Sequence, residues 1–138
     1  AIGEALAARL ANPGPDTPVK LFGGNLEVPA AILGQWYLLW GMAYNGNGRV
    51  PIGLLTGPWG QPQNRAEKYM EPAPVAMWAA ARLGQNDAAT VGALIDSLGR
   101  SGDPAWLDGD RVGALTALTD RRFAYDFAAW RAWWASGH

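Results

Sequence analysis

The stretch that decides the fold is PAPVAMWAAARLGQNDAATVGALIDSLG, residues 72–99, together with ALTALTDRRFAYDFAAWRAWW, residues 114–134. Apolar residues recur in both segments at the spacing of an amphipathic helix. The first segment predicts two helices, one carrying Val75, Trp78, Ala79 and Leu83 and the other carrying Val91, Leu94, Ile95 and Leu98. Gly84 and three polar residues separate them, so we expect an antiparallel helical hairpin.

Polar residues before the apolar segments are candidate helix caps, and they predict a second helix pair after residue 100. Asn86 or Asp87 can cap the second helix of the first pair, because a short side-chain oxygen accepts a hydrogen bond from a free backbone N–H. By the same argument Asp108 or Asp110 caps a third helix and Asp126 caps a fourth. The third helix carries Val112, Leu115 and Leu118, and the fourth carries Phe127, Trp130, Trp133 and Trp134.

The segment VAMWAAARLGQNDAATVGALIDSLG, residues 75–99, resembles a HEAT-like repeat of the short bacterial kind named after phycobilisome lyases. The ending LTDRRFAYDFAAWRAWW, residues 118–134, is similar to the closing segment of many such proteins. The resemblance covers about residues 71–136. It implies an all-α fold in which helical hairpins stack as a short HEAT-like α-solenoid, with a last helix that caps the open end.

The first half of the chain is less regular, and we expect one domain over residues 1–138. A loop-rich helical half covers about residues 1–70, and the HEAT-like half covers about 71–138. Residues 2–10 are expected to form a short helix and residues 11–27 an extended loop. Residues 50–55 can form a short helix or strand, and the Pro- and Gly-rich residues 56–64 are expected to present Trp59 in a surface loop.

Residues 28–44, VPAAILGQWYLLWGMAY, are the most apolar piece and predict a core helix that Asn45-Gly46 ends. The side chains expected to point inward are Ile32, Trp36, Leu39 and Trp40. A membrane span is disfavoured, because Pro29, Gly34 and Gly41 interrupt the segment and its tryptophans lie centrally instead of at two interfaces.

Composition excludes several classes of function. The chain has no cysteine, which excludes disulfides, thiolate nucleophiles and cysteine-bound zinc. Its only histidine is His138, so a Ser-His-Asp triad or a histidine general base is not expected. A net charge of -1 gives no electrostatic reason to bind nucleic acid. Asp103, Asp108 and Asp110 are also candidate metal ligands, but intervening residues such as Pro104 break their spacing. Helix capping explains Asp108 or Asp110 more simply.

Two functions remain. The first is a noncatalytic protein-binding or accessory-subunit module without cofactor or metal, since stacked helix pairs offer an extended surface for another protein. Its candidate partner surface is Trp59, Arg65, Tyr69, Trp106 and Trp133. The alternative is a glycan-binding or glycan-cleaving module that uses Trp59 and Tyr69 as platforms beside the carboxylates of Glu67 and Glu71.

The sequence also suggests a source and a compartment. Lys20 and Lys68 are the only lysines beside many arginines, which favours a GC-rich bacterial genome. The chain is cysteine-free and rich in tryptophan, with eight, and begins at Ala1. We therefore expect a periplasmic or extracellular protein, with a cytoplasmic one as the alternative.

Overall fold

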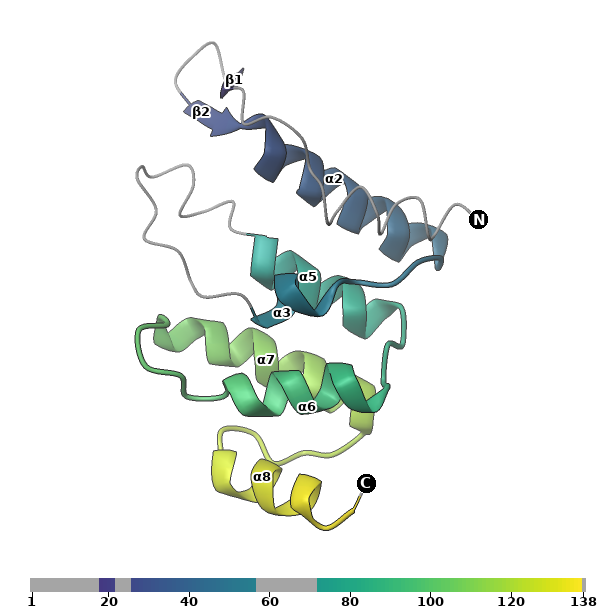
Figure 1. Ribbon diagram of the computed structural model, residues 1–138, viewed down its shortest axis with the longest axis vertical. Helices are drawn as coiled ribbons and strands as arrows, with labels where there is room; N and C mark the ends of the chain where they lie inside the picture. The colour runs from purple at the N-terminus through teal and green to yellow at the C-terminus, as the bar shows by residue number, and fades with distance from the viewer. Residues whose placement is uncertain (1–17, 22–25, 57–71, 138) are drawn as a thin grey trace.

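The computed structural model describes residues 18–21, 26–56 and 72–137 of the chain (Figure 1). Two short strands, β1 (Pro18–Leu21) and β2 (Leu26–Pro29), precede the helices. The helices are α2 (Ala30–Asn45), α3 (Ile52–Thr56), α5 (Pro72–Arg82), α6 (Ala88–Ser97), α7 (Ala105–Thr119) and α8 (Phe127–Ala135). The described body is helical, which confirms the all-α prediction. The helix expected over residues 2–10 and the loop over 57–64 lie outside the described residues.

The strand pair corrects the extended loop expected before residue 28. β1 and β2 are antiparallel, with Pro18 opposite Pro29 and Leu21 opposite Leu26. Each strand has only four residues, too few for the alternation of side chains to stand out in the sequence. The usable signal was Gly23-Gly24 between two runs that contain valine, a pattern typical of hairpins.

Helix ends follow the sequence closely, with one exception. Gly46 after α2 and Gly84 after α5 have φ of +63° and +65°, a conformation that glycine adopts without steric cost. Asp87 caps α6 by accepting a hydrogen bond from the Thr90 backbone N–H at 3.1 Å. Asp126 caps α8 in the same way.

The exception is α7. It begins at Ala105, with Pro104 at the N-cap position and no side-chain cap, so the prediction that Asp108 or Asp110 caps it is wrong. Proline at the boundary fixes φ near the helical value, which lets the helix begin a turn earlier than the aspartates indicated. Asp108 therefore lies in the first turn of α7, and both aspartates are free for other contacts.

The helices lie in two rows around a shared core (Figure 1). The first row is α2, α5 and α7, with α5 packed between the other two. The second row is α3, α6 and α8, with α6 in contact with both neighbours. Helices of the first row run in the same direction (Figure 1). α8 runs antiparallel to α6, since Phe127 lies against Gly99 and Trp134 against Gly92.

The core contains most of the leucines that the helical spacing predicted to be inside. Leu94, Leu98, Leu115 and Leu118 are buried, as expected. Leu83 is half-buried, and Trp78, expected in the core, is 37% exposed. Alanines of α5 supply the remaining contacts, because their small side chains let α5 approach both of its neighbours closely. The buried alanines are Ala73, Ala76, Ala79 and Ala80.

The orientation of α2 differs in part from the prediction. Leu39 is buried and Ile32 and Trp36 are half-buried, but Trp40 is 41% exposed. The buried side is completed by Met42 and Ala43. Among the described residues, no helix is both long enough and apolar enough to span a membrane.

A buried glutamine joins the two halves of the chain. The side-chain amide of Gln85 donates to the Val50 carbonyl at 2.9 Å, and its oxygen accepts from the Val50 backbone N–H at 2.7 Å. Arg49 adds a bidentate ion pair with Asp87 at 2.6 and 3.0 Å. The segment before α3 is therefore fixed to the turn between α5 and α6.

Candidate functional site

The predicted partner surface does not form one site in the described structure. Trp59, Arg65 and Tyr69, and the acids Glu67 and Glu71 of the glycan alternative, lie outside the described residues. Trp106 is exposed on the first turn of α7, whereas Trp133 lies on α8 in a groove that Leu118 also lines. Trp106 and Leu118 are about 18 Å apart along the helix axis, so Trp106 and Trp133 belong to different surfaces.

Two of the three aspartates weighed as metal ligands bind a buried arginine instead. The Arg111 side chain is fully buried, and its guanidinium donates to the carboxylates of Asp103 and, at 2.8 Å, Asp108. Asp103 also accepts a hydrogen bond from Arg100 at 3.0 Å. Asp108 accepts one from the backbone N–H of Gly99 at 3.0 Å.

This cluster is structural. Two arginines balance two carboxylates, which is the condition under which buried charge is tolerated. Burial raises the pKa of Asp103, but hydrogen bonds from Arg111 and Arg100 lower it more, so the pKa lies below its usual 3.8. Arg100 also donates to the Thr56 carbonyl at 2.6 Å, which ties α3 to the loop before α7. In the described residues no group of three or more His, Asp or Glu side chains could hold a metal ion.

Exposed aromatic side chains gather on the first row of helices. On α2, Tyr37, Trp40 and Tyr44 are spaced by three and four residues, so they share the side opposite buried Leu39 and Met42. Trp78 on α5 and Trp106 on α7 are exposed as well. We call this set the aromatic face; its exposed fractions are 71% (Tyr37), 41% (Trp40), 57% (Tyr44), 37% (Trp78) and 51% (Trp106).

Ring contacts hold the centre of the aromatic face in place. The ring centroids of Trp40, Tyr44 and Trp78 lie 5.4 to 5.6 Å from one another. The Arg82 guanidinium lies over the rings of Tyr44 and Trp78, 4.9 and 5.9 Å from their centroids, within cation–π range. These side chains therefore form an ordered platform across α2 and α5 while keeping much of their surface in water.

A pocket of about 330 Å³ lies beside the platform, between α5 and α7. Trp78 belongs to both the platform and the pocket wall. The described residues that line the pocket are Pro74, Met77, Trp78, Ala81, Gly109, Asp110, Gly113, Ala114 and Ala117. Asp110 carries the only charge among them, and the remaining lining is apolar.

Asp110 is in an unusual position for a carboxylate. Its carboxylate has no hydrogen bond or ion pair with any described residue. Burial raises the pKa of Asp110 above its usual 3.8, and the nearby charge of Arg111 offsets only part of the rise. Titratable groups perturbed in this way within a hollow are enriched at functional sites.

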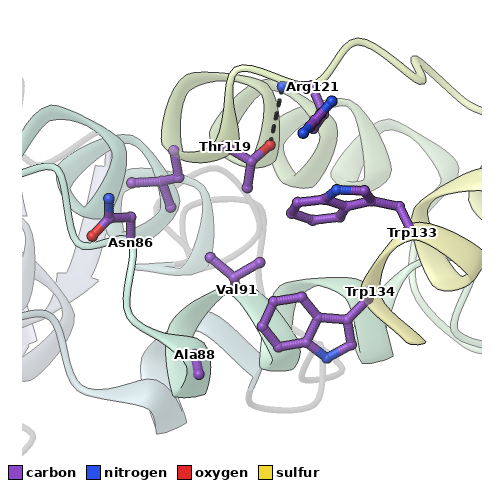
Figure 2. Close-up of a pocket in the computed structure, with 8 residues that line it drawn as sticks. Asn86, Ala88, Val91, Thr119, Arg121, Trp133 and Trp134 are labelled. Carbon is purple, nitrogen blue, oxygen red and sulfur yellow. Dashed lines mark hydrogen bonds between the residues drawn. The ribbon is translucent and has the colours of Figure 1, made fainter. Parts of the chain in front are cut away.

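A second hollow, a groove of about 430 Å³, lies between the start of α6, the end of α7, and α8. Figure 2 shows the indole rings of Trp133 and Trp134 on one side of the groove and Asn86 on the other. The Arg121 guanidinium lies 5.7 Å from the centre of the Trp133 ring. The Arg121 backbone N–H donates to the Thr119 hydroxyl at 3.2 Å, the dashed line in Figure 2.

The groove is part of the packing of α8. Trp133 contacts the rings of Phe123, Trp130 and Trp134, and Trp134 lies on α6 at Gly92. A Cβ atom at position 92 would stand 3.2 Å from the Trp134 ring, so the glycine permits this contact. Both tryptophans are half-buried, which leaves less ring surface for a ligand than the aromatic face offers.

The aromatic face was not predicted from the sequence, because two of its tryptophans were expected to point inward. Trp40 and Trp78 were expected in the core because they fall at helical spacing with other apolar residues, although tryptophan often keeps one side in water. The usable signal was the spacing of Tyr37, Trp40 and Tyr44, which places three large rings on one side of a helix. Asp110 was considered only as a cap or ligand, and no sequence signal placed it in an apolar pocket.

Comparison with known proteins gives no assignment: the chain matches no family model, no curated protein and no solved structure. The HEAT-like resemblance and the solenoid arrangement therefore stay predictions. The function is therefore inferred from the geometry of the chain.

Proposed function

We propose that this protein is a noncatalytic interaction module built on HEAT-like helical hairpins, and that it binds another protein through its aromatic face. In this proposal α2 with α3 and α5 with α6 are successive hairpins. α7 continues the first row, and α8 turns back to cover the end of the stack. The contacts of α5 with α2 and α7, and of α6 with α3 and α8, support this arrangement.

The observation that carries the proposal is the exposed ring cluster of Trp40, Tyr44 and Trp78. Isolated exposed apolar side chains need no explanation, whereas a contiguous apolar patch marks an interaction site. Tryptophan, tyrosine and arginine are the residues most enriched among binding hot spots. Because Arg82 and the neighbouring rings already hold these side chains in place, binding costs little side-chain entropy.

The site chemistry favours binding over catalysis. Acid–base cleavage of a glycosidic bond requires two carboxyl groups on opposite sides of the bond. Among the described residues that line the pocket beside the face, Asp110 is the one carboxyl group. Asp103 and Asp108 form ion pairs with Arg111 and do not line this pocket.

The test is affinity capture with a matched pair of variants. Immobilised protein is incubated with an extract of its source, and a retained protein is identified, purified and titrated. Tyr37→Ala/Tyr44→Ala should weaken its binding at least about tenfold, as loss of a hot spot does. Asp96→Ala is the control, because Asp96 is exposed on α6, in the second row of helices.

Equal binding by both variants would contradict the proposal, since the partner would then use another surface. Retention of an oligosaccharide in place of a protein would favour the glycan alternative instead.

A further inference from the structure

The pocket between α5 and α7 combines an unpaired carboxylate with apolar walls. A carboxylate that loses water without gaining a partner destabilises the fold, so such a group is kept when it serves another purpose. Asp110 is half-buried and has no polar contact among the described residues. Its nearest charge, Arg111, points into the core, where Asp103 and Asp108 hold it.

The walls of the pocket suit a long aliphatic chain. Met77, Ala81 and Ala117 supply apolar contacts, and Trp78 presents an aromatic ring. Gly113 lines the pocket, and a Cβ atom built there meets nothing within 4 Å, so the floor is open. A lysine side chain has four methylene groups to bury along such walls and a compact positive charge for the carboxylate.

We infer that this pocket receives a lysine side chain of the protein that binds the aromatic face. The inference rests on the proposed function and adds the chemistry of the partner: a lysine beside apolar residues that cover the rings. The ammonium group lies at Asp110, and the stem lies along Ala81 and Ala117. Trp78 contributes a cation–π contact at the edge of the pocket.

The probe is a pair of five-residue peptides, acetylated and amidated, with lysine or norleucine at the centre and alanine elsewhere. Binding to the full chain is followed by NMR, through the Trp78 indole N–H and the backbone amides of Gly109 and Gly113. We expect the lysine peptide to shift these signals with a Kd on the order of 1 mM. The norleucine peptide, which keeps the apolar chain without the charge, should bind at least about tenfold more weakly.

Two variants test the site without disturbing the core. Asp110→Asn removes the charge and should abolish the lysine shifts, whereas Asp96→Asn on the exposed side of α6 should not change them. Gly113→Leu fills the pocket and improves the helix propensity of α7, so it should block binding in a folded protein. Gly53→Leu is its control, because a Cβ there also meets nothing within 4 Å and α3 belongs to the second row.

Binding should also depend on pH. Lysine binding should weaken as pH falls through the raised pKa of Asp110, because the carboxylate then loses its charge. The other charged or titratable side chains that face the site are Arg111 on α7, Arg82 over the Trp78 ring, and Tyr125 against Gly109. The variant Asp96→Asn, on a helix with no described residue in the pocket lining, should keep the same pH dependence.

The outcomes separate this inference from the proposed function. Equal binding of both peptides, unchanged binding by Asp110→Asn, or no shift at 10 mM peptide would overturn the lysine site. The lysine site would also be overturned if Asp110→Asn bound the captured partner as tightly as the native chain while Tyr37→Ala/Tyr44→Ala bound it more weakly. That result leaves the aromatic face as the binding surface and removes only the lysine.

Discussion

At the scale of single residues, the Asp110 carboxylate should lower the stability of the fold at neutral pH while it contributes to binding. Its raised pKa means that the folded state holds the proton more tightly than the unfolded state does. The stability this adds is present below the unfolded pKa and is lost as pH rises through the folded pKa. Asp110→Asn should therefore raise the melting temperature at pH 7, and the gain should shrink at pH 3.

Thermal unfolding followed by circular dichroism measures this effect, with Asp96→Asn as the control. A lower melting temperature for Asp110→Asn at pH 7 would show that the carboxylate accepts a structural hydrogen bond.

Replacing Arg111, in contrast, should lower the stability of the fold. Arg111→Met leaves two carboxylates near the core without their main partner, and breaking a buried pair from one side costs roughly 3–5 kcal/mol. Urea unfolding of this variant measures the cost. A triple variant should recover part of the stability, because it also removes the uncompensated charges. It combines Arg111→Met with Asp103→Asn and Asp108→Asn. A loss below about 0.5 kcal/mol for Arg111→Met would place the guanidinium in water instead.

The sequence predicts single residues well where the cause is local. Asp87, Asp126, Gly46 and Gly84 act where they were expected to, because caps and positive-φ turns depend on adjacent backbone groups. Arg111 could not be found in this way. An arginine is normally exposed, and its burial depends on two aspartates that only the loop before α7 brings together.

At the scale of elements, α8 predicts a loss of cooperative folding on truncation. Trp130 is fully buried, donates its indole N–H to the Ala124 carbonyl at 2.9 Å, and meets Phe123 edge-on. Arg131 adds a hydrogen bond to the Leu98 carbonyl at 2.5 Å. Removing residues 126–138 exposes the α6 surface that α8 covers, so the shortened chain should lose its sharp thermal transition.

Differential scanning calorimetry of that chain tests the role of α8 as a cap, with removal of residues 136–138 as the control. A single sharp transition at nearly the original temperature would mean that the tryptophans of α8 face a partner instead.

The sequence of α2 also explains why Trp40 was wrongly expected to point inward. Its 16 residues contain no charged side chain, so no polar side marks which face meets water. Helix spacing then fixes which residues share a face and leaves the choice between faces to packing against α5. α7 was predictable in type but not in its start, because Pro104 replaces the side-chain cap that the prediction relied on.

At the scale of the whole molecule, stability should fall in acid. Hydrogen bonds from Arg49 hold the pKa of Asp87 far below its usual range, and the pKa of Asp103 is also lowered. A lowered pKa adds stability above the unfolded value, near 3.8, that is lost as pH falls through the folded value. The urea midpoint should therefore drop between pH 5 and pH 2, with Asp87→Asn reducing the drop.

A midpoint that stays constant over that range would contradict the ion pairs. The Arg49–Asp87 pair is largely exposed, so salt screens it. Its contribution to the free energy of unfolding should therefore decrease in 1 M salt.

The arrangement of the two rows was only partly predictable. The two helices α5 and α6 followed from the sequence of residues 72–99, whereas the stack that the HEAT-like resemblance implies stays a prediction. The reversal of α8 and the aromatic face depend on contacts between segments distant in sequence, as at Trp40 with Trp78. No local pattern encodes such contacts, so the spacing of the three α2 rings could not show that Trp78 of α5 joins them.

The central claim is that the aromatic face binds the partner, and hydroxyl-radical footprinting of tyrosine and tryptophan tests it most directly. Oxidation is compared for the free protein and for its complex with the captured partner. We expect the five aromatic side chains of the aromatic face to lose reactivity on binding, while Trp133 and Trp134 on α8 keep theirs. Protection of Trp133 and Trp134 with an unchanged aromatic face would contradict this claim.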